Sequence, residues 1–78
     1  MKILSSQVDS IKVEKNCSAV VRTDKGVEIT MYGEIMNGKI DESMTGPSYW
    51  NSDIFHNLTD QEQEEIKKEV NKELKRFL

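Results

Sequence analysis

The chain has few of the residues from which catalytic and metal sites are usually built. Its 78 residues include one cysteine, Cys17, and one histidine, His56. A single cysteine cannot form an internal disulfide, which fits a reducing compartment. No stretch matches a catalytic, metal-binding or nucleotide-binding motif. We therefore expect no enzymatic activity, no metal and no cofactor.

The sequence also lacks long apolar runs and any excess of basic charge. No apolar stretch approaches the roughly 18 residues that indicate a membrane-spanning helix. The segment Met1–Ser6 has no apolar core long enough for a signal peptide. We therefore expect a cytoplasmic protein with no membrane partner. Acids and bases are interspersed and the net charge is −3, which argues against a dedicated binder of phosphate backbones.

The clearest pattern that is present predicts a helix over Thr59–Leu78. Ile66, Val70, Leu74 and Leu78 recur every fourth residue, with Phe77 beside them. At helical spacing they form one apolar stripe, and charged or amide residues occupy most other positions. Thr59 and Glu62 have the spacing of a capping box at the start of this helix.

Between Val8 and Met44 the apolar pattern changes to period two, which is typical of strands with one buried face. Three turn signals interrupt it, at residues 15–17, 24–26 and 37–38. The residues expected on the buried face are Ile11, Val13, Ala19, Val21, Val27, Ile29, Met31, Ile35, Ile40 and Met44.

The three turns predict cross-strand registers that agree with one another. A left-handed Gly26 suits the second turn, and Asn37-Gly38 suits a type I′ turn in the third. The expected pairs are Val13–Ala19, Ile11–Val21, Val21–Ile29, Ala19–Met31, Ile35–Ile40 and Met31–Met44. All of these registers place the apolar set on one face, and a slip of one residue would turn a strand's apolar set to solvent.

These patterns predict an α+β fold: a four-stranded antiparallel β-meander, order 1-2-3-4, with the C-terminal helix packed across its apolar face. We expect one domain over residues 1–78, with the sheet at about 8–44, an aromatic connector at 45–58 and the helix at 59–78. The segment Met1–Gln7 either packs on the edge of the core or frays. The expected solvent face carries Lys12, Glu14, Ser18, Val20, Arg22, Glu28, Thr30, Tyr32, Glu34 and Asp41, with Arg22 opposite Glu28.

The connector holds three of the five aromatic residues. Tyr49 and Trp50 are of the types enriched at binding hot spots, but large side chains are also needed to close the open end of a small core. Ile54, Phe55 and Leu58 are expected in the core. Ser52 or Asp53 is expected to cap a short helical turn at residues 54–57.

Other candidate sites are weaker. Asp53 and His56 are spaced for one face of a helical turn, but no nucleophile or oxyanion donor accompanies them. Cys17 falls in a predicted turn where Lys15 is near, but the turn has no other sign of a reactive thiol. The first and last strands, Val8–Glu14 and Lys39–Met44, are edges that can recruit another strand.

The leading hypothesis is a small non-enzymatic module that binds another protein as an accessory or regulatory factor, with Tyr49, Trp50 and Tyr32 as its binding residues. Small size and general character are also typical of proteins from phages or mobile elements, which is an association and not a physical argument. Alternatives are an obligate homo-oligomer, a homodimer through an edge strand, and an enzyme using Asp53, His56 and Cys17. A further alternative is a small nucleic-acid-binding protein. It would need its basic side chains to converge at one end of the sheet, namely Lys12, Lys15, Arg22, Lys25 and Lys39.

Overall fold

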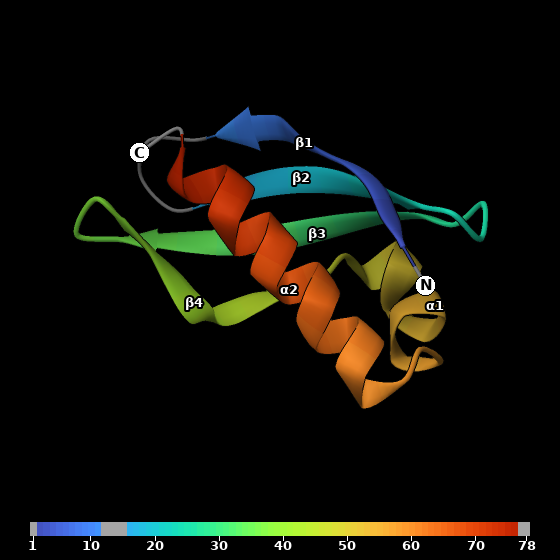
Figure 1. The fold of residues 1–78 in the computed structure, drawn as a ribbon. Coiled ribbons are helices and arrows are strands. Elements are labelled where there is room, and N and C mark those ends of the chain that lie inside the picture. Colours follow the sequence, from blue (N-terminus) through green and yellow to red (C-terminus); the bar gives the residue numbers. More distant parts are fainter. Residues whose placement is uncertain (1, 12–15, 77–78) are drawn as a thin grey trace.

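The computed structural model describes residues 2–11 and 16–76, and in this part of the chain a four-stranded sheet is covered by one long helix (Figure 1). The elements are β1 (Ile3–Ile11), β2 (Asn16–Thr23), β3 (Glu28–Met36), β4 (Lys39–Pro47), the 3-10 turn η1 (Tyr49–Asn51), α1 (Ser52–His56) and α2 (Asp60–Lys75). All strand pairs are antiparallel, in the order β1-β2-β3-β4. The predicted fold class, a β-meander with a C-terminal helix across one face, is therefore confirmed.

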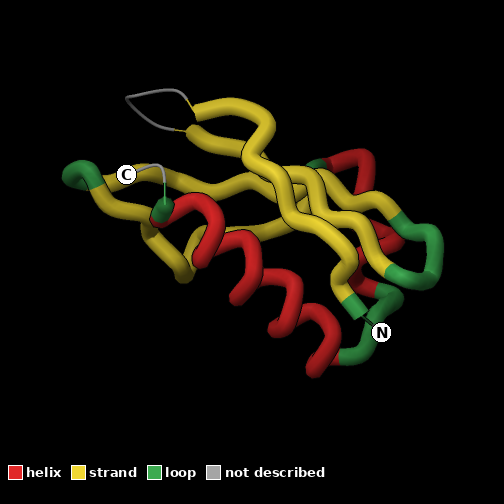
Figure 2. Tube along the Cα trace, turned by 45° about the horizontal axis from the view of Figure 1, so that its top comes forward, coloured by secondary structure: helices red, strands yellow, loops and turns green. Residues whose placement is uncertain are grey.

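The core lies between the sheet and α2, which crosses the strands obliquely (Figures 1 and 2). The helix contributes Ile66, Val70 and Leu74 from the predicted stripe, all fully buried. Phe77 and Leu78 lie outside the described residues. The sheet contributes Cys17, Ala19, Val21, Ile29, Met31 and Ile35, and α1 contributes Phe55. The two apolar patterns of the sequence, of period two and of helical period, thus meet in one core.

The second and third turns have the predicted geometry. Gly26 has φ 74°, while Asn37 and Gly38 have φ 54° and 76°, as a type I′ turn requires. The pairs Ala19–Met31, Val21–Ile29 and Ile35–Ile40 form as expected. Short turns with demanding backbone angles set these registers directly.

The predicted register of the first hairpin is wrong. Ile11 pairs with Cys17 and not with Val21, and Ala19 pairs with Val8. Val13 lies outside the described residues. The strand begins at Ile3, so the expectation that the sheet starts near Val8 is also corrected. The observed register gives Ile3–Val8 backbone partners on β2, which the predicted register would have left without a strand to pair with.

The predicted pair Met31–Met44 is wrong as well, because Met31 pairs with Pro47. The register shifts between Tyr32 and Glu34, where β4 carries extra residues. In that stretch the Asp41 carboxylate accepts hydrogen bonds from the backbone N–H and the hydroxyl of Ser43. As a result Thr45 takes the inward position, and Met44 is 52% exposed.

Candidate functional site

The segment after β4 holds Tyr49 and Trp50 in a fixed position beside β3. Ser48 N–H donates to the Thr30 carbonyl at 2.9 Å, and Thr30 N–H donates to Asn51 Oδ1 at 2.9 Å. The Ser48 hydroxyl also donates to Asn51 Oδ1, at 3.0 Å. Asn51, and not the predicted Ser52 or Asp53, is the N-cap of α1, and its side chain bonds to the sheet. The two aromatic residues are therefore held between two anchor points on the backbone of β3.

Both aromatic side chains point into solvent. Tyr49 is 87% exposed and Trp50 is 86% exposed, and their rings contact each other edge to face at 5.7 Å. The interpretation that they close the end of the core is therefore wrong. Phe55 closes it instead, with 1% of its surface exposed, while the expectation of a buried Ile54 is also wrong. Only one side of the short η1–α1 segment faces the core, and Phe55 occupies that side.

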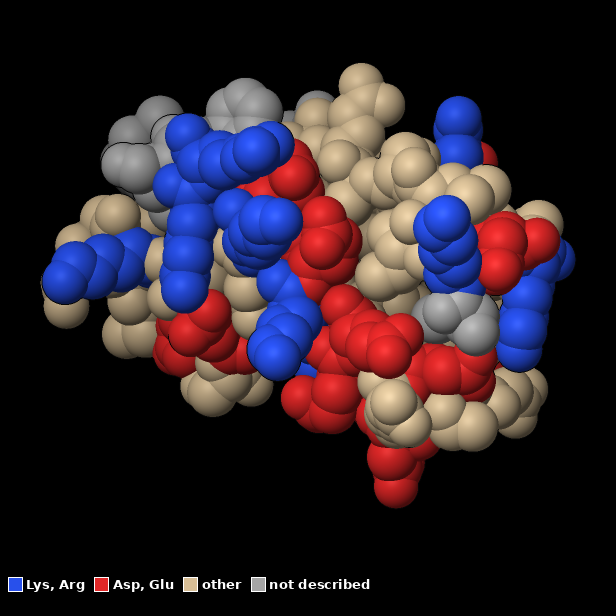
Figure 3. All heavy atoms as spheres, viewed as in Figure 1, with Lys and Arg blue, Asp and Glu red and all other residues tan. Residues whose placement is uncertain are grey.

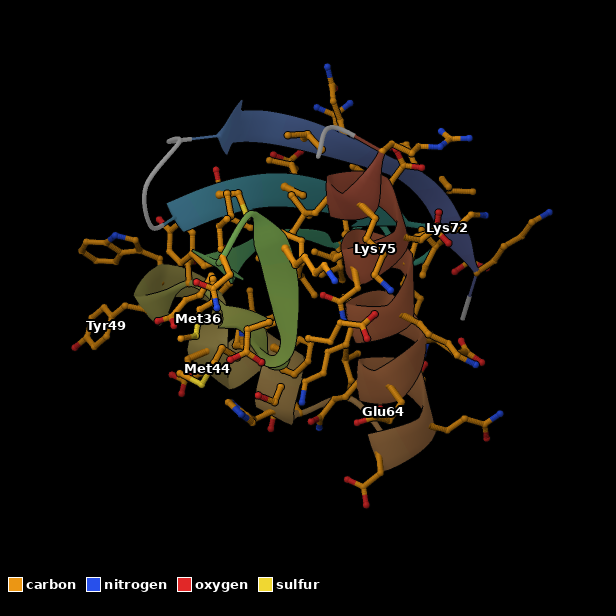
Figure 4. All side chains as sticks on the ribbon, turned by 90° about the vertical axis from the view of Figure 1, so that its left-hand side faces the viewer. Met36, Met44, Tyr49, Glu64, Lys72 and Lys75 are labelled. Atoms are coloured by element: carbon orange, nitrogen blue, oxygen red, sulfur yellow. The ribbon has the colours of Figure 1, made fainter. Side chains whose placement is uncertain are left out.

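Tyr32 lies on the face of β3 opposite α2 and is 49% exposed, as expected for the solvent face. Thr30, the residue that anchors Ser48 and Asn51, is its neighbour on the same face of the same strand. Tyr49, Met36 and Met44 also lie on the side of the sheet away from α2 (Figure 4). We name the residues Tyr32, Tyr49 and Trp50 the aromatic face. The structure thus brings all three predicted binding residues to one side of the sheet.

The charges on this outward side are not all paired. Arg22 and Glu28 form the predicted cross-strand ion pair at 3.0 Å. Glu34 stands directly opposite Asp41, and the ion pairs of the described residues include neither of them. This like-charge pair was missed at the sequence level, although the Ile35–Ile40 register implies it. Ser18, expected on this face as a solvated residue, is buried and lies opposite Tyr32.

The side of the molecule covered by α2 is highly charged but not uniform in sign. Lys and Arg gather over the C-terminal half of the helix and Asp and Glu over its N-terminal half (Figure 3). Lys75 pairs with Glu42 at 2.6 Å and Arg76 with Glu73 at 3.2 Å. The shallow groove between β4 and α2 mixes both signs, being lined by Glu42, Ser43, Glu64, Lys67, Lys68 and Asn71. No single ligand charge is favoured there.

The predicted convergence of basic residues does not occur among its described members. Arg22 and Lys25 are at the β2–β3 turn, where they pair with Glu28 and Glu62. Lys39 follows the β3–β4 turn at the opposite end of the sheet. Lys12 and Lys15 lie outside the described residues. Arg22, Lys25 and Lys39, the described members of this set, therefore do not form the concentrated basic face that a phosphate backbone requires.

The three residues of the catalytic alternative are not assembled into one site. Cys17 is in β2, and not in a turn as predicted, with 1% of its surface exposed. Burial raises the pKa of its thiol, against a smaller lowering by a hydrogen bond from the backbone of Gly33. Asp53 and His56 are exposed on α1, where His56 Nδ1 lies 2.8 Å from the Ser52 carbonyl. The geometry supports a structural role for Cys17.

Within residues 2–11 and 16–76, no three His, Cys, Asp or Glu side chains gather so that they could hold a metal ion. No helix among these residues has both the length and the apolar character needed to cross a membrane. No protein-family model, no curated protein and no solved structure matches the chain.

Proposed function

We propose that this chain is a small, non-enzymatic, cytoplasmic protein-interaction module that acts as an accessory or regulatory factor through its aromatic face. The observation that carries the proposal is the exposure of Tyr49 and Trp50 on an anchored backbone. Tyr and Trp are the residue types that most often dominate binding energy at protein interfaces. A backbone that is already ordered loses less conformational entropy on binding, so the anchoring favours recognition.

Association between copies of the chain, through the edge strands of the sheet, is the competing hypothesis. The edges β1 and β4 each have one side unpaired in the described sheet, and Leu4 on β1 is 63% exposed. A homodimer through an edge strand stays a prediction, as does an origin in a phage or mobile element. We expect the proposed binding module to be a monomer when its partner is absent.

The first test is the fluorescence of Trp50 together with the mass of the chain in solution. Because Trp50 is the only tryptophan, its emission reports on this one site. We expect red-shifted emission, efficient quenching by acrylamide and the mass of a monomer. Blue-shifted, protected emission in a dimer would contradict the proposal, because the aromatic face would then be the contact between two copies.

The second test is capture of a partner from a lysate of the source cells by immobilised protein, compared between variants. Trp50→Ala should weaken capture of the main bound protein by about 30-fold or more, the effect expected at a hot spot. Leu4→Ala is the matched control, because it also removes an exposed apolar side chain but on the opposite edge of the sheet. If Trp50→Ala and Leu4→Ala reduce capture by the same factor, apolar contact in general, and not the aromatic face, retains the protein.

A further inference from the structure

Gly46 leaves one outward position of the sheet beside the aromatic face without a side chain. Gly46 pairs with Tyr32, so the two residues share the outward face of the sheet. A Cβ atom placed on Gly46 would meet nothing within 4 Å. The chain then continues through Ser48, whose bond to Thr30 holds Tyr49 and Trp50 nearby. The missing side chain of Gly46 therefore leaves open space on the outward face, at the position directly opposite Tyr32.

Next to Tyr32 along the outward face of β3 lies the acidic pair, Glu34 and Asp41. Like charges directly opposite each other in an antiparallel pair destabilise the sheet. Asp41 receives hydrogen bonds from Ser43, but these do not neutralise its charge. Lys39 is exposed on the same hairpin and forms no ion pair with either acid in the described structure. A cation brought by a partner would remove this repulsion.

The distance between Gly46 and the acidic pair along the sheet determines the spacing of side chains that a bound peptide needs. Tyr32 and Glu34 are successive outward residues of β3, so their Cα atoms are about 7 Å apart. In an extended peptide, side chains on one face repeat with the same spacing. An apolar side chain over Gly46 and a basic side chain at the acidic pair would therefore come from residues two positions apart.

We propose that the aromatic face binds an extended segment of a partner protein in which a small apolar residue and a lysine or arginine stand two positions apart. This inference rests on the proposed function and names the chemistry of the partner. The acidic pair repels phosphates, so single-stranded nucleic acid and anionic membranes fit the face poorly even though its rings could stack on bases. A second copy of the chain would bring its own acidic pair to the same surface.

The test uses the full chain and a synthetic library of short peptides in which each position is varied in turn. The wild-type protein should select peptides with a basic residue two positions from an apolar one. Glu34→Lys should weaken binding of the selected peptide by about five- to tenfold, since it reverses a partly exposed charge beside the ligand, and it should shift selection toward acidic residues. Gly46→Val should remove the apolar preference by filling the open space over Gly46. Glu65→Lys, an equal charge change on the exposed side of α2, should leave selection unchanged.

The possible failures can be told apart. Absence of any selected peptide, together with persistent Trp50-dependent capture of a protein, would overturn this inference and leave the proposed function standing. Selection without a basic preference, or tighter binding of a single-stranded oligonucleotide or an anionic vesicle, would also overturn it. Loss of both peptide selection and Trp50-dependent capture would overturn both proposals. Equal loss of binding in Glu65→Lys would show that net charge, and not the acidic pair, controls the interaction.

Discussion

At the scale of single residues, two glycines in the sheet have opposite roles that only their surroundings reveal. A Cβ on Gly33 would lie 3.0 Å from Leu74 Cδ1 and 3.2 Å from Cys17 Sγ, whereas one on Gly46 would meet nothing. Gly33 allows α2 to approach the sheet where Leu74 packs, while Gly46 opens a space on the outward face. Neither difference is visible from the identity of the residue or from its immediate neighbours in the sequence.

We expect Gly33→Ala to lower the free energy of unfolding by about 1–3 kcal/mol, because the added methyl group overpacks the interface between β3 and α2. Gly46→Ala is the matched control and should change it by less than about 0.5 kcal/mol. Urea denaturation of both variants measures the difference. Equal stability of the two variants would mean that Leu74 and Cys17 move aside without cost.

The acidic pair allows a second prediction at this scale. Because Glu34 and Asp41 repel each other across the hairpin, Glu34→Lys should stabilise the fold by about 0.2–1 kcal/mol by turning a repulsive pair into an attractive one. The same change is expected to weaken peptide binding. Thermal and urea unfolding of the variant would check the gain, and a loss of stability would show that the acids are already neutralised in the native protein.

At the scale of the elements, the start of α2 is the feature for which sequence and structure agree most fully. Thr59 Oγ1 accepts a hydrogen bond from Glu62 N–H at 3.1 Å, and Glu62 Oε1 accepts one from Thr59 N–H at 3.0 Å. The bond from the Thr59 backbone is the largest cause that lowers the pKa of Glu62, with smaller contributions from the Thr59 hydroxyl and Lys25. A capping box depends on only four consecutive residues, so its sequence signature is sufficient.

This box predicts a pH-dependent contribution to stability. The stabilisation by ionised Glu62 is fully present above the ordinary glutamate pKa of about 4.3 and is lost as the pH falls through the lowered value. Glu62→Gln should therefore be less stable than the wild type at neutral pH and equally stable below the lowered pKa. Glu65→Gln, which removes a carboxylate of the same helix that forms no ion pair in the described structure, should show no such convergence in denaturation experiments across this range.

At the scale of the whole molecule, one buried polar contact joins the two layers. The Thr45 hydroxyl donates a hydrogen bond to Asn71 Oδ1, linking β4 to α2. Both residues are buried. The shifted register of β4 is what places Thr45 inward, so this contact and the exposure of Met44 arise from the same irregularity.

We expect Thr45→Val and Asn71→Leu each to lower the free energy of unfolding by about 1–3 kcal/mol, because each leaves the other's polar group buried without this partner. The double variant should recover much of that loss, since both partners are then apolar. Denaturation of the four proteins in a double-mutant cycle measures the coupling. Strictly additive losses would show that the two side chains contribute independently.

The sequence by itself determined the fold class, α2 with its cap, the turns of two of the three hairpins and most of the apolar positions that form the core. These features depend on short segments: a periodic stripe, a capping box, and turns at Gly26 and Asn37-Gly38 that permit few backbone conformations. The chemistry of the aromatic face could also be predicted in part, because Tyr32, Tyr49 and Trp50 were identified by residue type.

Only the tertiary structure decided the register of β1, the bulged path of β4, and whether Trp50 is buried or exposed. Each of these depends on contacts between distant segments. Ile3–Val8 gain backbone partners only on β2, Thr45 turns inward toward Asn71, and Phe55 fills the end of the core in place of Trp50. The open position at Gly46 and its place beside the acidic pair follow from the register of β4. Local patterns specify elements, while the free energy of packing them together selects the surface that remains exposed.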